Sequence, residues 1–124
     1  MGQSMWKYFK RSEFDCPCCH QNKTSNALIN KLDVLRGKMG IPFHILSGYR
    51  CMSHNLSSSV GGKEHSMHLS GLAADISTKG WNGYQKYMMI ARSVALGFTG
   101  IGVGKDLIHL DIRSGFPVLW TYYD

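Results

Sequence analysis

Two histidines and one aspartate in this sequence have the residue types of a catalytic zinc site. His68 and Asp75 lie in the segment GGKEHSMHLSGLAADIS, and His109 lies in the segment LIHLDIR. Two imidazoles and one carboxylate are a recurrent ligand set for zinc, and three protein ligands leave a fourth position open for water. The spacing of His68 and Asp75 also fits a loop histidine followed by a surface or capping aspartate. The metal site therefore depends on a fold that brings the three side chains together.

Two other metal motifs match the sequence less well. An HExxH zincin has two histidines one helical turn apart around a glutamate, and the segment KEHSMH does not have that order. His109 and Asp111 form an HxD pair, which is typical of iron(II) sites with two histidines and one carboxylate. Those sites need a second histidine later in the chain, and no histidine follows His109. We therefore expect one catalytic zinc ion.

The elements that would carry these ligands are two short strands with alternating faces. In residues 72–77, alternation places Asp75 on one face and the larger apolar residues on the other. In residues 107–113, His109 and Asp111 share one face, opposite the isoleucines. If the apolar faces of both strands pack against helices, the acid and the imidazole can meet on the other face of the sheet.

The rest of the chain predicts two helices and three more strands. Apolar residues spaced three and four apart indicate helices over residues 24–39 and 81–96. Thr24 or Ser25 would cap the first helix, and Gly40 would end it. Short apolar runs indicate strands over residues 42–47, 100–103 and 118–123. We predict a single α+β domain over residues 1–124, with a small antiparallel sheet and helices packed on one face.

A ten-residue motif carries a resemblance to a known family. SMHLSGLAAD, residues 66–75, matches the SxHxxGxAxD signature of the zinc D-alanyl-D-alanine peptidases at every fixed position. Four further segments occur in the order and rough spacing of small members of that family, including phage-type lysins: SGYRC (47–51), HN (54–55), VGG (60–62) and GIGVGKDLIHLDIR (100–113). The resemblance implies a fold shared with the zinc-binding domain of hedgehog signalling proteins, and it implies zinc ligation by His68, Asp75 and His109.

The resemblance also implies roles for residues around the metal. Arg50 would bind substrate or stabilise the transition state, because a guanidinium can hold a carboxylate through two hydrogen bonds; a solvated loop arginine is the alternative. The family often places its general base three residues before the last zinc histidine, which is Asp106 here. Regular alternation would put Asp106 and His109 on opposite faces, so this role needs a turn or bulge. Asp111 is the alternative base, or it would orient a zinc ligand through a hydrogen bond. Ser66 would form a hydrogen bond with the substrate or with residues that hold the ligands.

The four cysteines allow three interpretations. Cys16, Cys18 and Cys19 lie in the segment CPCC, and Cys51 follows Arg50. Free thiols, one or two disulfides, and a second structural zinc are all compatible with this pattern. The CxC spacing is not the C-x2-C spacing of zinc knuckles. Because no export signal is visible, we expect reduced thiols, with the Cys16 region packed near Cys51. His20, His44, His54 and His65 are expected to be ordinary loop or surface residues.

Composition narrows the classes of partner. The net charge of +6 favours an anionic partner, such as a cell-wall polymer. The lysines and arginines are scattered rather than gathered in a block or stripe, so we do not expect nucleic-acid binding. No apolar run is long enough to span a bilayer, and no signal peptide is visible. We expect a monomer that stays in the cytoplasm until release, as phage-type lysins do, or that acts at the cell wall.

The sequence thus predicts a zinc peptidase acting on the stem peptides of peptidoglycan. It would be a D-alanyl-D-alanine carboxypeptidase or a related cell-wall endopeptidase. The alternative is a binding module of the hedgehog-like fold that keeps zinc without hydrolysing a substrate.

Overall fold

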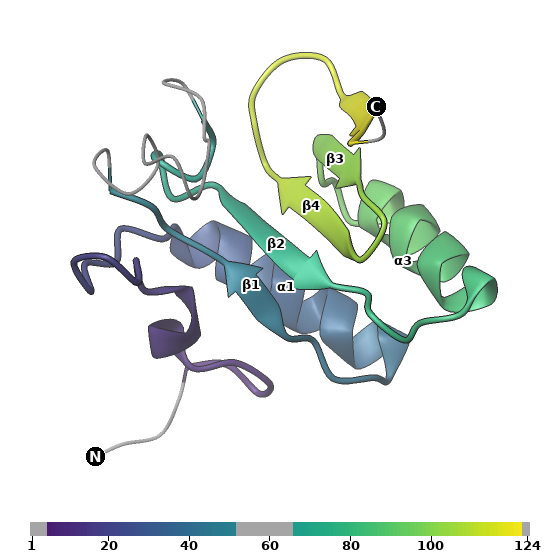
Figure 1. The fold of residues 1–124 in the computed structure, drawn as a ribbon, viewed down its shortest axis with the longest axis horizontal. Helices are drawn as coiled ribbons and strands as arrows, with labels where there is room; N and C mark the ends of the chain where they lie inside the picture. The colour runs from purple at the N-terminus through teal and green to yellow at the C-terminus, as the bar shows by residue number, and fades with distance from the viewer. Residues whose placement is uncertain (1–4, 52–65, 123–124) are drawn as a thin grey trace.

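A computed structural model describes residues 5–51 and 66–122 of the chain (Figure 1). Five strands form one sheet in the order β1-β2-β4-β3-β5. In chain order the elements are η1 (Arg11–Phe14), α1 (Asn26–Met39), β1 (Ile45–Ser47), β2 (Ala73–Ser77), α3 (Gly83–Ala95), β3 (Gly100–Val103), β4 (Leu107–Asp111) and β5 (Val118–Thr121). The predicted α+β class is confirmed, and the predicted elements occur with ends that differ by a few residues.

The sheet is antiparallel except at one edge. β1 pairs with β2, β2 with β4, and β4 with β3, all antiparallel, whereas β5 pairs with β3 in parallel. Asp111, at the end of β4, is the register partner of Gly100, at the start of β3. The segment after Asp111 crosses the start of β3, and Val118 then pairs with Gly100 on the edge of β3 that β4 does not occupy. This crossing makes the last pair parallel, so the sheet is mixed rather than wholly antiparallel.

Local sequence signals explain where the helices begin and end. The Ser25 side chain accepts a hydrogen bond from the backbone N–H of Ala27 and caps α1. Gly40 ends α1 in the left-handed conformation, with φ of 70°. Asn82 and Gln85 form a reciprocal capping box at the start of α3.

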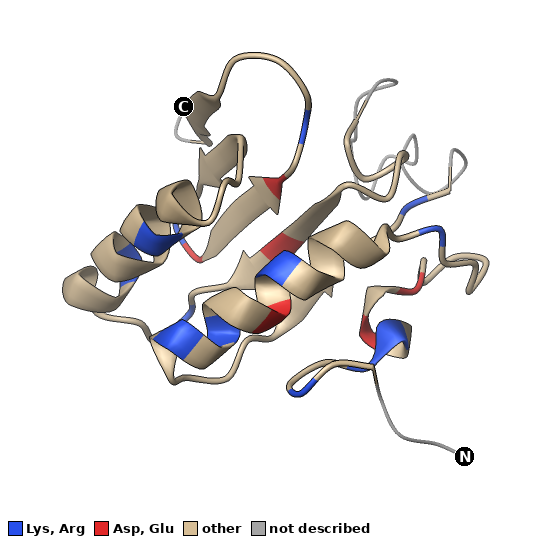
Figure 2. Cartoon of the chain, turned by 180° about the vertical axis from the view of Figure 1, so that it is seen from behind, with Lys and Arg blue, Asp and Glu red and all other residues tan. Residues whose placement is uncertain are grey.

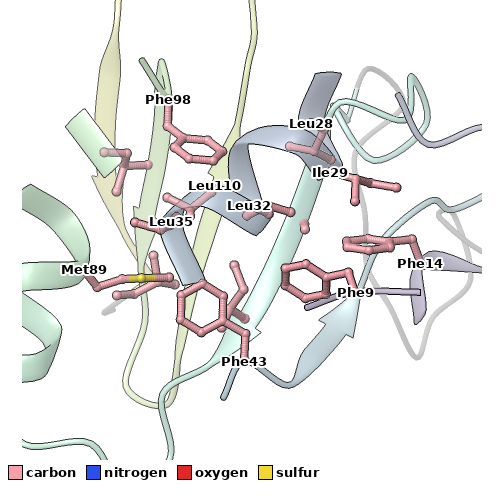
Figure 3. Close-up of a cluster of buried hydrophobic side chains, with 14 of the residues drawn as sticks. Phe9, Phe14, Leu28, Ile29, Leu32, Leu35, Phe43, Met89, Phe98 and Leu110 are labelled. Carbon is pink, nitrogen blue, oxygen red and sulfur yellow. The ribbon is translucent and has the colours of Figure 1, made fainter. Parts of the chain in front are cut away.

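Both helices cover the same face of the sheet. Figure 2 views the chain from behind, and α1 and α3 lie in front of the strands there. Leu28, Leu32 and Leu35 of α1 and Met89 of α3 belong to one buried cluster, drawn in part in Figure 3. The strands contribute the alternate apolar residues to this cluster, namely Ala74, Ile76, Ile101, Ile108 and Leu110. The alternation read from the sequence is therefore confirmed, and Asp75, His109 and Asp111 lie on the face away from the helices.

Two phenylalanines of the N-terminal segment pack into the core beside Phe43, which the sequence pattern did not predict. Phe9, Phe14 and Phe43 are buried, with ring centroids of Phe9 at 5.5 Å from Phe14 and 6.4 Å from Phe43. Phe14 also accepts a hydrogen bond from the N–H of Tyr49 through its backbone carbonyl, at 3.0 Å. The segment before α1 is thereby attached to the chain just after β1. Within the described residues, no helix is both long and apolar enough to cross a membrane.

Candidate metal centre

His68, Asp75 and His109 converge on one point beside the sheet. Each offers one ligand atom, and these atoms all lie within 4.8 Å of one another. Asp75 and His109 are register partners on β2 and β4, and His68 lies in the turn that leads into β2. The Oδ1 atom of Asp75 lies 3.3 Å from Nε2 of His68 and 2.9 Å from Nδ1 of His109. The predicted ligand set is thus brought together in space.

The turn that carries His68 is shaped by the residues of the ten-residue motif. The Ser66 hydroxyl accepts a hydrogen bond from the backbone N–H of His68 at 3.1 Å. Gly71 has a φ of 72°, and a Cβ atom there would lie 2.1 Å from the carbonyl oxygen of Lys23. Only glycine fits such a close approach of two backbones. Ser66 and Gly71 therefore fix the path of the chain between His68 and β2.

Hydrogen bonds on the far side of each imidazole orient the ring. Nδ1 of His68 lies 2.7 Å from the carbonyl oxygen of Gly48. Because a carbonyl oxygen only accepts, Nδ1 carries the proton and Nε2 presents its lone pair toward Asp75. In the same way, Nε2 of His109 donates to Oδ2 of Asp111 at 2.7 Å, which leaves Nδ1 toward Asp75. Metal-binding histidines are usually held by such a carbonyl or carboxylate partner.

Asp111 is itself held firmly behind His109. Its side chain is fully buried, and its two oxygens accept from Nε and Nη2 of Arg113 at 2.9 and 2.7 Å. The backbone N–H of Arg113 adds a third hydrogen bond at 3.2 Å. The guanidinium of Arg113 also lies over the Trp120 ring, 5.1 Å from its centroid. A chain of contacts thus runs from Trp120 and Arg113 through Asp111 to His109.

The electrostatics of the cluster keep both carboxylates ionised. Burial alone would raise the pKa of Asp75, but hydrogen bonds with His109 and His68 outweigh it and hold that pKa well below its usual range. Burial would also raise the pKa of Asp111, but Arg113 and His109 lower it strongly. For His109, burial lowers the pKa and hydrogen bonds with Asp111 and Asp75 raise it, with a net increase. The ionised carboxylates of Asp75 and Asp111 therefore lie next to the imidazoles, and their negative charge favours the binding of a cation.

The donor atoms fit zinc. Ligand atoms bonded to zinc at about 2.0–2.1 Å in a tetrahedron are about 3.3 Å apart. The observed separation of His68 Nε2 and Asp75 Oδ1 is 3.3 Å, and that of Asp75 Oδ1 and His109 Nδ1 is 2.9 Å. Two imidazole nitrogens with their remaining N–H groups occupied, and one ionised carboxylate oxygen, form the donor set that zinc takes in hydrolytic sites.

Arg50 lies at the edge of this centre. Its Nη2 atom is 3.3 Å from Oδ2 of Asp75, the oxygen that does not face the histidines. Its Nε atom donates to the Ser47 hydroxyl at 2.9 Å, and its backbone N–H donates to the carbonyl of His68. The guanidinium is therefore next to the ligands, and its predicted role in substrate binding stays a prediction.

Asp106 lies just before β4 and is not one of the three converging ligands. It is exposed in the turn between β3 and β4, where its carbonyl accepts from the N–H of Thr78. β4 pairs with β2 without a register break from Leu107 to Asp111, and Asp106 stands directly before this strand. Because Asp106 lies in the turn rather than in the strand, the alternation of β4 does not determine which face its carboxylate takes. The role of Asp106 as general base therefore stays a prediction.

Two glycines make room for this centre, and the sequence analysis missed their role. A Cβ atom on Gly100 would lie 2.1 Å from Oδ1 of Asp111, and one on Gly102 would lie 2.6 Å from the Trp120 ring. Without a side chain at position 102, the Trp120 ring reaches His109, with 5.0 Å between ring centroids. The pattern GxG in GIGV was the available signal, because residues two apart on a strand share a face.

The remaining histidines do not join the centre within the described part of the chain. His20 and His44 are exposed and lie outside the ligand cluster. His54 and His65, together with the HN and VGG segments, lie outside the described residues.

Comparison with known families agrees with this geometry. The family model for peptidase M15 matches residues 7–111, which include all three candidate ligands. No curated protein matches the chain. The M15 peptidases are zinc-dependent, and the donor set found here is suited to that metal. The matched range covers most of the chain, from the N-terminal aromatic segment to the end of β4, and the chain therefore belongs to the peptidase M15 family.

Proposed function

We propose that this chain is a zinc peptidase that hydrolyses stem peptides of peptidoglycan, as a D-alanyl-D-alanine carboxypeptidase or a cell-wall endopeptidase. The observation that carries the proposal is the convergence of His68, Asp75 and His109 in a chain that belongs to the M15 family. The family match does not favour the alternative of a binding module without activity.

Each ligand has a defined part in holding the metal. His68 would bind through Nε2 and His109 through Nδ1, because Gly48 and Asp111 occupy their other nitrogens. Asp75 would bind through Oδ1, which already faces both rings. When bound, zinc polarises the scissile carbonyl and lowers the pKa of its water toward neutrality.

Arg50 is the residue best placed to bind the substrate. Its guanidinium is close to the ligands, and its carboxylate partner Asp75 would share its charge with the metal. The guanidinium can then bind a carboxylate at the end of a stem peptide, or the oxygen that becomes negative during hydrolysis. A carboxypeptidase must bind the terminal carboxylate of its substrate in every turnover. If Arg50 binds that carboxylate, it helps to determine which bond is cleaved.

The charge of the chain suits an anionic polymer. The sequence has 14 lysines and arginines against 8 aspartates and glutamates. Figure 2 shows basic residues on α1, on α3 and in the N-terminal segment. Such a distribution would raise the concentration of the protein at an anionic wall without a specific contact.

Mass spectrometry of the products of digested peptidoglycan tests the proposal. The zinc-loaded chain is incubated with purified peptidoglycan and with a peptide that ends in D-alanyl-D-alanine. Loss of a terminal alanine identifies a carboxypeptidase, and cleavage inside the stem or cross-link identifies an endopeptidase. The His109→Ala variant is the matched control and is expected to release neither product. A zinc-loaded chain that releases no product from either substrate contradicts the proposal.

A further inference from the structure

A second cluster of metal-binding side chains lies near the candidate metal centre and shares no residue with it. The sulfur atoms of Cys16, Cys19 and Cys51 all lie within 4.8 Å of one another. The sulfurs of Cys16 and Cys51 are 3.6 Å apart, and all three residues are free cysteines. Residues 16–19 and Cys51 are far apart in sequence, so the fold has brought their thiols together.

The separation of the sulfurs corresponds to a shared zinc ion. Sulfurs bonded to zinc at about 2.3 Å in a tetrahedron are about 3.8 Å apart. The sulfurs of a disulfide are about 2.0 Å apart. The 3.6 Å between Cys16 and Cys51 is close to the first value.

The turn that holds Cys16 and Cys19 has the spacing of a zinc knuckle. Two residues separate them, which is the C-x2-C spacing of structural zinc sites. The same segment also contains the CxC spacing of Cys16 and Cys18, which is not typical of zinc knuckles. The turn closes with a hydrogen bond from the His20 N–H to the Cys16 carbonyl at 2.7 Å.

One backbone N–H group is directed at the buried sulfur of this turn. The N–H of Cys51 donates to the Cys16 sulfur at 3.5 Å. This hydrogen bond holds the Cys51 backbone against Cys16, so the two sulfurs are brought together by the fold. Cys19 is exposed and Cys51 is half-buried, so an ion can enter from solvent.

We propose that Cys16, Cys19 and Cys51 bind a structural zinc ion, separate from the ion of the candidate metal centre. Three thiolates form a soft donor set that selects zinc over harder cations. A fourth donor, such as a water molecule, would complete the tetrahedron. Cys18 is exposed beside the cluster, but its sulfur is not one of the three that converge.

This ion would connect two segments that shape the catalytic side of the molecule. Gly48 and Arg50, which hold His68 and Asp75, lie directly before Cys51 in the chain. Gly48 packs so closely on the N-terminal segment that a Cβ atom there would lie 2.7 Å from the Cα atom of Phe14. Zinc binding at the thiolates would contribute to folding and would fix the Gly48–Arg50 segment against the chain that leads into the CPCC turn.

Metal content and cobalt spectroscopy of the reduced full-length chain test this site without any peptidase assay. We expect about two zinc ions per chain when both sites are filled. Cobalt substitution should produce a sulfur-to-cobalt charge-transfer band, which a site of two histidines and one aspartate cannot give. The band should persist in His109→Ala, whose metal content falls by about half. It should be lost in Cys51→Ser, whose remaining metal is bound at the histidine site.

Cys18→Ser is the matched control, since it makes the same substitution in the same turn at a cysteine outside the cluster. It should keep both the band and the metal content. If Cys51→Ser does not fold, Cys19→Ser carries the same test at an exposed position. A fully reduced chain that binds cobalt without a charge-transfer band overturns the proposal. Equal loss of metal in Cys18→Ser and Cys19→Ser overturns the three-ligand assignment.

Discussion

Replacing Asp111 with asparagine tests whether the residues behind His109 control the metal. Asp111 accepts four hydrogen bonds, three from Arg113 and one from Nε2 of His109. Asparagine has nearly the same size, but one of its two terminal atoms is an NH2 group that cannot accept. Either His109 or Arg113 then faces a donor instead of an acceptor. The imidazole loses both its orientation and the negative charge that favours metal binding by Nδ1.

The size of this effect follows from measured losses at comparable positions. Removing a partner that orients a metal-binding histidine lowers metal affinity about 10- to 100-fold. This range corresponds to about 1.4–2.7 kcal/mol of binding free energy. We expect Asp111→Asn to fall in the upper half of the range, because the lost carboxylate is fully buried and leaves unpaired donors behind it.

A zinc competition titration against a chromophoric chelator measures this effect. The titration uses the Cys19→Ser background, so that the histidine site alone contributes to the signal. Asp106→Asn is the matched control, since it makes the same substitution at an exposed residue on the same hairpin. Its zinc affinity should equal that of the parent chain. If the affinity of Asp111→Asn lies within a factor of about two of the parent value, the argument that His109 depends on Asp111 is refuted.

Three further predictions concern the strand face and the metal. Gly102→Ala should lower the free energy of unfolding by about 1–3 kcal/mol in urea, because its methyl group would overlap the Trp120 ring, whereas Gly83→Ala, with open space around it, should not. Asp106→Asn should lower the peptidase activity about a hundredfold or more in a product assay, because asparagine cannot accept the proton of the attacking water; full activity in this variant would rule out Asp106 as the general base. Removal of the metal by a chelator should abolish activity and lower the melting temperature in calorimetry, and zinc should restore both, since a ligand at about 100 times its Kd stabilises the folded state by about 2.7 kcal/mol.

The ligands could be found from the sequence because their placement depends on alternation along single strands. Asp75 and His109 each stand opposite the apolar residues of their own strand, and the structure pairs them in register on β2 and β4. A shift of either strand by one residue would have moved its apolar residues out of the core. The requirement to bury Ile76 and Ile108 therefore places Asp75 and His109 on the same face.

The parallel edge of the sheet and the role of Trp120 could not be found in this way. Both depend on which edge of β3 pairs with β5, and the alternation of side chains within β5 does not determine that edge. The space for Trp120 comes from the missing side chain of Gly102, on a different strand. A glycine in a strand signals a close approach, but the sequence does not identify the residue that approaches it.

The role of Asp106 stays a prediction, and it concerns the chemistry most directly. β4 pairs with β2 in unbroken register from Leu107 to Asp111, but Asp106 lies in the turn before it, where strand alternation does not fix the face of a side chain. Asp111 obeys the alternation, but its oxygens are occupied by Arg113 and His109. Residues that hold the metal are thus determined by the strand pattern of the fold, whereas a proton acceptor must reach the substrate, whose position the strand pattern does not determine. The activity of Asp106→Asn, measured beside its unchanged zinc affinity, separates these two requirements in one variant.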